Sequence, residues 1–187
     1  MLAISHNAEE YLDTALTALR CDRDWTAVLD DLPVPVYTTD PQGRVTYWNN
    51  ACVEFAGRVP QLGDDRWCVT WRLFGTDGEP MAHECCPMAD AIRSGKAVRG
   101  KIAIAMRPDG SRRAFRAYPT PLFDGSRMTG AVNMLIDVSD EQSDALTAQA
   151  SRCRRLARAT LDREASRILG SMASGYETTA ASLRKPS

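Results

Sequence analysis

The 187-residue sequence has little of what metal centres, membrane spans and nucleic-acid binders require. It has only two histidines, and its six cysteines include no Cys-x-x-Cys pair, so we expect no metal site. No apolar run approaches the roughly 20 residues of a membrane span, and the first residues are acidic where a secretory signal is basic. The 23 basic and 24 acidic residues nearly cancel, which argues against a dedicated nucleic-acid binder. We therefore expect a cytoplasmic chain that contacts neither a membrane nor nucleic acid.

Motifs of common enzymes are also missing. The sequence has no glycine-rich phosphate loop, no Gly-x-Ser-x-Gly, and no histidine on a dimerising helix followed by an ATP-binding domain. Several aspartates lie in segments rich in glycine and proline, where turns favour aspartate without any catalytic role. We expect no catalytic residues and no enzymatic activity.

The spacing of apolar residues divides the chain into three zones. Residues 1–31 are predicted to form an N-terminal flanking helix, because apolar residues recur there at intervals of three and four: Leu12, Ala15, Leu16 and Leu19 and, after a break, Trp25, Val28 and Leu29. Residues 32–138 read mainly as strands and turns and are assigned to one domain. The helical period returns in residues 139–187, which predicts one long helix or a helical hairpin. We favour the hairpin, because Asp162 is a suitable N-cap for a second helix.

Strands and turns can be placed within the central zone. Val34–Thr39 and Val45–Trp48 flank a Pro/Gly turn and predict a hairpin. Three later strands predict an antiparallel meander over residues 98–106, 112–118 and 128–138. Short helices are expected over residues 51–56 and 85–94, and loops over residues 57–82.

Polar residues at helix starts suggest caps. Asn49 can cap the short helix that follows it, and Ser139 with Gln142 fits a capping box for the C-terminal helix. Arginines 152, 154, 155 and 158 spread around that helix, so we expect them to be solvated.

Three segments, taken in order, carry a family resemblance. The first is LDDLPVPVYTTDPQGRVTYWNNACVEFAG, with a proline-led strand, an Asp-x-x-Gly turn, a second strand and an Asn at a helix start. The second is the loop and helix WCVTWRLFGTDGEPMAHECCPMADAIRSGKAVRG. The third is AVNMLIDVS, a last strand with an Asp-Val-Ser ending. Over about residues 26–142 the chain resembles the PAS sensor domains of bacterial two-component proteins.

This resemblance implies an α+β fold. PAS domains have a five-stranded antiparallel sheet with short helices on one face, and here N-terminal and C-terminal helices would flank it. A ligand, when present, lies between the sheet and the short helices. The residues expected to line such a pocket are Trp48, Phe55, Trp71, Phe115, Asn133 and Leu135. The opposite set on the last strand, Val132, Met134 and Ile136, is more apolar and could be the inner face instead, so the choice of face stays open.

The cofactor, if any, is not identified by the sequence. Flavin photosensors of the light-oxygen-voltage type carry a reactive cysteine in an Asn-Cys-Arg-Phe-Leu-Gln-like helix, and no segment here matches it. His83 is a weak candidate for an axial haem ligand, and Cys85 with Cys86 is a candidate redox pair. A haem- or redox-dependent sensor is therefore the alternative reading.

The resemblance also implies a function in bacterial signal transduction. We expect a non-enzymatic sensor that binds a small ligand or a partner protein and transmits the change through its flanking helices. A homodimer is expected, and a histidine kinase is a possible signalling partner.

Overall fold

The computed structural model describes residues 2–21 and 24–183, with side chains from Ala8 onward. The ends of the predicted flanking zones, residues 1 and 184–187, lie outside this part of the chain, as do residues 22–23. The helices are α1 (Leu2–Arg20), α2 (Trp25–Asp30), α3 (Asn50–Ala56), a 3₁₀ turn (His83–Cys85), α4 (Pro87–Ser94), α5 (Ser139–Ala159) and α6 (Arg163–Leu183). The strands are β1 (Val36–Thr39), β2 (Val45–Trp48), β3 (Arg72–Phe74), β4 (Pro80–Met81), β5 (Lys101–Met106), β6 (Arg112–Ala117), β7 (Thr120–Asp124) and β8 (Arg127–Asp137).

The sheet is antiparallel, and its centre is the predicted one. The five expected strands lie side by side in the order β2-β1-β8-β6-β5. Three further strands extend it: β3 pairs with β5, β4 pairs with β3, and β7 pairs with the first half of β8. The expectation of loops throughout 57–82 is therefore wrong at β3 and β4. These strands have three and two residues, too few to show an alternating pattern.

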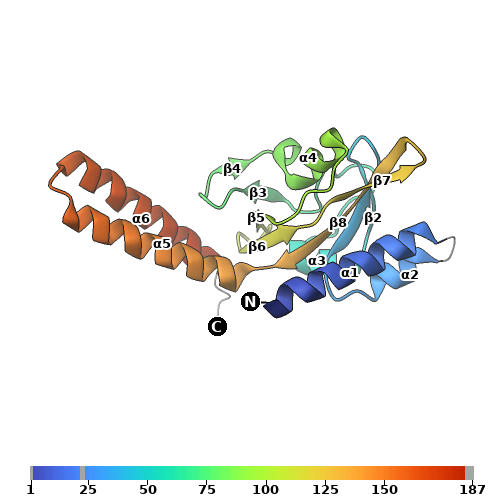
Figure 1. The fold of residues 1–187 in the computed structure, drawn as a ribbon, viewed down its shortest axis with the longest axis horizontal. Coiled ribbons are helices and arrows are strands. Elements are labelled where there is room, and N and C mark those ends of the chain that lie inside the picture. The colour runs from blue at the N-terminus through green and yellow to red at the C-terminus, as the bar shows by residue number, and fades with distance from the viewer. Residues whose placement is uncertain (1, 22–23, 184–187) are drawn as a thin grey trace.

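Helices cover both faces of the sheet (Figure 1). One face packs against α3 and α4, and we call the buried residues between them the inner cluster. The other face packs against α1, α2 and the bases of α5 and α6, and we call this the outer cluster. Because both faces are covered, β1 is buried at all four positions and β8 at seven consecutive ones, where a one-sided sheet would alternate.

The C-terminal zone is a helical hairpin that projects away from the sheet (Figure 1). The seam between its helices contains Ala150, Cys153 and Ala173, and the turn falls at residues 160–162. Asp162 caps α6 as predicted, because its Oδ1 accepts the N–H groups of Glu164 at 2.8 Å and Ala165 at 3.2 Å. None of the helices in residues 2–21 or 24–183 combines the length and apolarity of a bilayer span.

Two predicted caps do not form. Asn49 precedes α3, but its side chain is turned away from the helix and bonds to the backbone of residues 29–36. Ser139 Oγ donates to Asp137 Oδ1 at 2.6 Å and accepts the Ala114 N–H at 3.0 Å, so it does not cap α5. In both cases, the side chain bonds to backbone groups of a neighbouring element and not to the free N–H groups at the start of its helix.

Candidate functional site

The inner cluster lies where the family resemblance places a ligand. Of the six predicted pocket residues, Phe55, Phe115 and Leu135 are buried in it, and Trp48 packs against its edge. Asn133 is buried in β8 beneath the same helices. Trp71 lies outside the cluster: it is 40% exposed, with the Arg72 guanidinium carbon 4.4 Å from its ring centroid.

Strand β8 presents its two sides to different surroundings. Ala131 and Leu135 belong to the inner cluster, whereas Val132, Met134 and Ile136 belong to the outer cluster. The more apolar set therefore faces the flanking helices. Asn133 lies on the same side as Ala131 and Leu135, because side chains alternate along a strand.

A chain of hydrogen bonds runs through the inner cluster. Asn133 Oδ1 accepts the Tyr118 N–H at 3.1 Å, and Asn133 Nδ2 donates to Tyr37 Oη at 3.0 Å. Tyr37 Oη donates to the Trp67 carbonyl at 3.0 Å. Burial raises the pKa of Tyr37 well above its ordinary value, so its hydroxyl stays a neutral donor. These hydrogen bonds connect β8 to β1, and β1 to the loop before β3.

Trp67 is held in a conformation that side chains rarely adopt. Its φ is +68°, in the left-handed region, which is unusual for a bulky residue. Its N–H donates to the Gly43 carbonyl at 2.6 Å, and its ring lies directly against the Gly43 backbone. This geometry directs the Trp67 carbonyl inward, where Cys86 Sγ also donates to it at 3.6 Å. Strained residues of this kind are common at binding sites and switch regions.

The structure places the candidate redox cysteines, Cys85 and Cys86, in different surroundings. Cys52, Cys68 and Cys86 are buried, and burial raises the pKa of each thiol, in Cys86 to about 12. Cys85 is exposed while its neighbour Cys86 is buried, so the two thiols face different surroundings. A raised thiol pKa lowers reactivity towards oxidants. Within the described residues, no three His, Cys, Asp or Glu side chains are placed to hold a metal ion.

His83 lines an outer hollow of about 330 Å³ beside the inner cluster. Its Nε2 lies 3.2 Å from the Thr70 carbonyl oxygen. On the hollow's rim, Arg58 binds Asp65 through two bonds of 3.0 and 2.8 Å and donates to the Val69 carbonyl. The Arg58–Asp65 ion pair therefore stabilises the rim of the hollow. The His83 imidazole already has a hydrogen-bond partner in the Thr70 carbonyl.

The six residues expected to line the pocket include neither Tyr37 nor Trp67, and Asn49 was named only as a helix cap. A tyrosine inside a short apolar strand is a usable signal, because a buried hydroxyl needs a partner. No sequence pattern predicts the bonds that the Trp67 carbonyl and the Asn49 side chain make, since their partners are distant in the chain.

A family model described as a PAS fold matches residues 29–143. No curated protein matches the sequence. A light-oxygen-voltage domain studied with a flavin analogue is 17% identical, with a TM-score of 0.50 over 70% of this chain and 96% of that one. The Rhodobacter sphaeroides LOV protein is 15% identical, with a TM-score of 0.49 over 86% and 93%. An RNA-binding light-oxygen-voltage receptor is 25% identical, with a TM-score of 0.49 over 66% of this chain and only 36% of the receptor.

Proposed function

This chain belongs to the PAS fold family, and from that premise we propose that it is a non-enzymatic signal-sensing protein. It binds a small ligand in the inner cluster and passes the change to its C-terminal helical hairpin. The observation that carries the proposal is the position of β8. Leu135 lies in the inner cluster, Met134 and Ile136 lie in the outer cluster with the flanking helices, and the strand leads directly into α5.

Two polar atoms support a ligand on the inner side of the sheet. Within the described part of the chain, Thr39 Oγ1 and Trp48 Nε1 are buried and have no hydrogen-bond partner. Trp48 is the register partner of Tyr37, and Thr39 follows Tyr37 by two residues, so all three share one side of the sheet. A buried polar group without a partner is costly. A ligand with polar groups beside a ring or alkyl portion would satisfy these atoms.

The junction between β8 and α5 gives a ligand a route to the hairpin. Asp137 at the end of β8 accepts from Arg113 at 2.7 Å and from the Ser139 N–H at 2.9 Å. Glu141 in the first turn of α5 accepts from Arg116 at 2.9 Å. A shift of β8 relative to β6 therefore changes the bonds that set the direction of α5. A ligand acts in this way only if it binds one arrangement better than the other.

The partner in this function is a second copy of the chain or a signalling protein such as a histidine kinase. The chain resembles sensor domains that act on such proteins, and its hairpin extends beyond the sheet where a partner can reach it (Figure 1).

Native mass spectrometry of the full chain, followed by denaturing mass spectrometry, tests the ligand proposal. We expect an excess mass that denaturation removes, and we expect Asn133→Leu to lose it. Asn50→Leu is the matched control, because Asn50 is exposed outside the inner cluster. Addition of the identified compound to the stripped protein should then slow hydrogen exchange in α5. An unliganded chain that shows no thermal shift with any compound tested would contradict ligand binding, and a haem mass with visible colour would favour the His83 alternative.

A further inference from the structure

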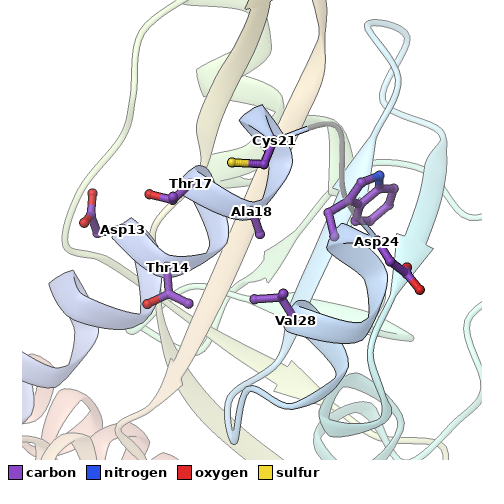
Figure 2. Close-up of a pocket in the computed structure, with 8 residues that line it drawn as sticks. Asp13, Thr14, Thr17, Ala18, Cys21, Asp24 and Val28 are labelled. Atoms are coloured by element: carbon purple, nitrogen blue, oxygen red, sulfur yellow. The ribbon is translucent and has the colours of Figure 1, made fainter.

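An apolar groove lies between the two N-terminal helices. It has a volume of about 380 Å³ and is lined by residues of α1 and α2 and of the segments beside them. Figure 2 shows Ala18 of α1 and Val28 of α2 directed into the space between the helices. Val28 is 40% exposed, which is unusual for a residue at the centre of a helix pair. We call this surface the N-terminal groove.

The rim of the N-terminal groove is acidic. Asp13 and Asp24 line it directly. Between Ala8 and Asp31 the sequence has seven acidic and two basic residues. An occupant of the groove should therefore present apolar side chains surrounded by positive charge.

The tip of the C-terminal hairpin has this character. Four of its large apolar residues are exposed, and we call them the tip patch: Leu156, Leu161, Ile168 and Met172. Leu161, in the turn, is fully exposed at 102%. Between Ser151 and Arg167 the sequence has six arginines and two acidic residues, and all six arginines are exposed.

The apolar residues of the tip patch lie on one side of the hairpin. Arg154 of α5 binds Glu177 of α6 at 2.6 Å, which marks the opposite side. At about 100° per residue, Leu156 is turned about 200° from Arg154 around α5. Met172 is turned about 140° from Glu177 around α6, and Ile168 precedes Met172 by four residues and shares its face. The tip patch is thus a continuous apolar surface next to exposed arginines.

The tip patch cannot reach the N-terminal groove of its own chain. The turn of the hairpin and the C-terminal end of α1 lie at opposite ends of the molecule (Figure 1). We infer that the tip patch of one copy docks into the N-terminal groove of a second copy, with Leu161 between Ala18 and Val28. Arg158 and Arg163, which flank the turn, lie against Asp13 and Asp24. This contact joins two different surfaces, so two copies form a closed dimer if the geometry allows reciprocal docking and a larger ring or filament if it does not.

The contact is independent of the proposed ligand site, because it uses none of the inner cluster. It predicts that the full chain self-associates in sedimentation velocity and that raising salt from about 0.05 M to about 0.5 M weakens the association. Leu161→Asp should weaken it by at least about tenfold, because a charge enters an apolar groove. Leu62→Asp is the matched control, since Leu62 is also exposed, at 59%, but lies in the loop between α3 and β3. It should leave the association unchanged.

Charge reversal tests which surfaces meet. Arg158→Glu with Arg163→Glu should weaken association, and so should Asp13→Arg with Asp24→Arg. Asp24 accepts a bond from Thr26, so Asp13→Arg alone is included to leave that contact intact. Equimolar mixing of the two reversed variants should restore association, because the intact tip of one meets the intact groove of the other. A chain that stays monomeric, an association unaffected by Leu161→Asp, or mixing that restores nothing would each overturn the inference.

Discussion

At the scale of single residues, Asn49 connects three parts of the chain through its side chain: the end of α2, the loop after it, and the start of β1. It is fully buried, and its Oδ1 accepts the Val36 N–H at 3.0 Å. Its Nδ2 donates to the carbonyls of Leu29 at 2.9 Å and Val34 at 3.0 Å. This one side chain therefore fixes the path from the end of α2 into β1.

Replacement of Asn49 by alanine should be strongly destabilising. The change removes the partners of the buried Val36 N–H and of the half-buried Val34 carbonyl, whereas the Leu29 carbonyl still accepts the Leu32 N–H at 3.3 Å. Each unsatisfied group costs about 1–3 kcal/mol, so we expect Asn49→Ala to lower the free energy of unfolding by at least about 2 kcal/mol, measured by urea denaturation. Asn50→Ala, at the exposed neighbouring position, should change it by less than about 0.5 kcal/mol. Equal effects at the two positions would show that the hydrogen bonds of Asn49 do not stabilise the path from α2 into β1.

The candidate site shows how far sequence reasoning reaches at this scale. Asn133 was identified because a polar residue among apolar neighbours in a strand indicates a buried partner. Trp71 was included by residue type alone and lies outside the inner cluster. The bond between Tyr37 and Trp67 was not predicted, because it joins positions thirty residues apart. Which side of β8 faces inward depends on the helices that cover each face, and alternation alone cannot decide that.

At the scale of elements, the turn between β1 and β2 packs closely against the loop that contains Trp67. Gly43 has φ +80°, and a Cβ there would lie 2.2 Å from the Trp67 ring. Gly63, in the same loop as Trp67, has φ +81° with open space around it. The two glycines therefore separate the effect of backbone conformation from the effect of close packing.

Alanine at these two glycines should have unequal effects. Gly63→Ala should cost about 1–2 kcal/mol, the penalty for a side chain in the left-handed region. Gly43→Ala adds a steric conflict with Trp67 and should cost about 1–3 kcal/mol more. Thermal unfolding of the two variants measures the difference. A difference near zero would mean that the Trp67 ring moves away freely and does not hold the loop.

The junction of β8 and α5 should make stability depend on pH. Burial alone would raise the pKa of Asp137, but the bonds from Ser139 and Arg113 outweigh it and leave the pKa below the ordinary value of 3.8. A carboxylate with a lowered folded-state pKa adds stability that is complete above its unfolded pKa. That stability is lost as pH falls through the folded pKa.

Urea unfolding between about pH 6 and pH 2 tests this dependence. We expect Asp137→Asn to flatten the acid limb of the plot of unfolding free energy against pH. Asp140→Asn removes an exposed carboxylate from the first turn of α5, beside the same junction. It should leave the acid limb as in the unmodified protein. Parallel curves for all three proteins would contradict a stabilising role for Asp137.

Elements with a clear period were predictable, and elements that depend on distant partners were not. Strands β5, β6 and β8 and the hairpin follow from alternation and helical spacing over six or more residues, and β1 and β2 follow from the Pro/Gly turn between them. Strand β3 forms because the edge of β5 offers it hydrogen-bond partners, and β4 forms because β3 in turn offers partners to it. The capping box at Ser139 failed because the Ala114 N–H competes for the same hydroxyl. Tertiary contacts override local preference in each of these cases.

At the scale of the whole molecule, the buried residues by which the C-terminal hairpin joins the outer cluster lie at its base. Leu146 of α5 and Ala180 and Leu183 of α6 are buried in the outer cluster. Farther from the sheet the two helices pack against each other, through Ala150, Cys153 and Ala173. The base of the hairpin is therefore part of the outer cluster, whereas Leu156, Leu161 and Ile168 nearer the turn are exposed.

Release of the hairpin's base from the outer cluster should loosen the hairpin without unfolding the sheet. Leu183 is 1% exposed, so Leu183→Glu places an unpaired charge in the outer cluster. We expect hydrogen exchange in the base of α5 and the second half of α6 to accelerate by at least about tenfold, because local opening requires less free energy. Exchange in β1 and in α3 should stay as slow as before. Ala181→Glu, two residues earlier on an exposed face of the same helix, is the matched control and should leave exchange unchanged in both the hairpin and the sheet.

If exchange accelerates equally in the hairpin and the sheet, the two unfold as one cooperative unit. The hairpin could then not act as a separately movable output element, and the route proposed from the inner cluster through β8 would have to end at the sheet.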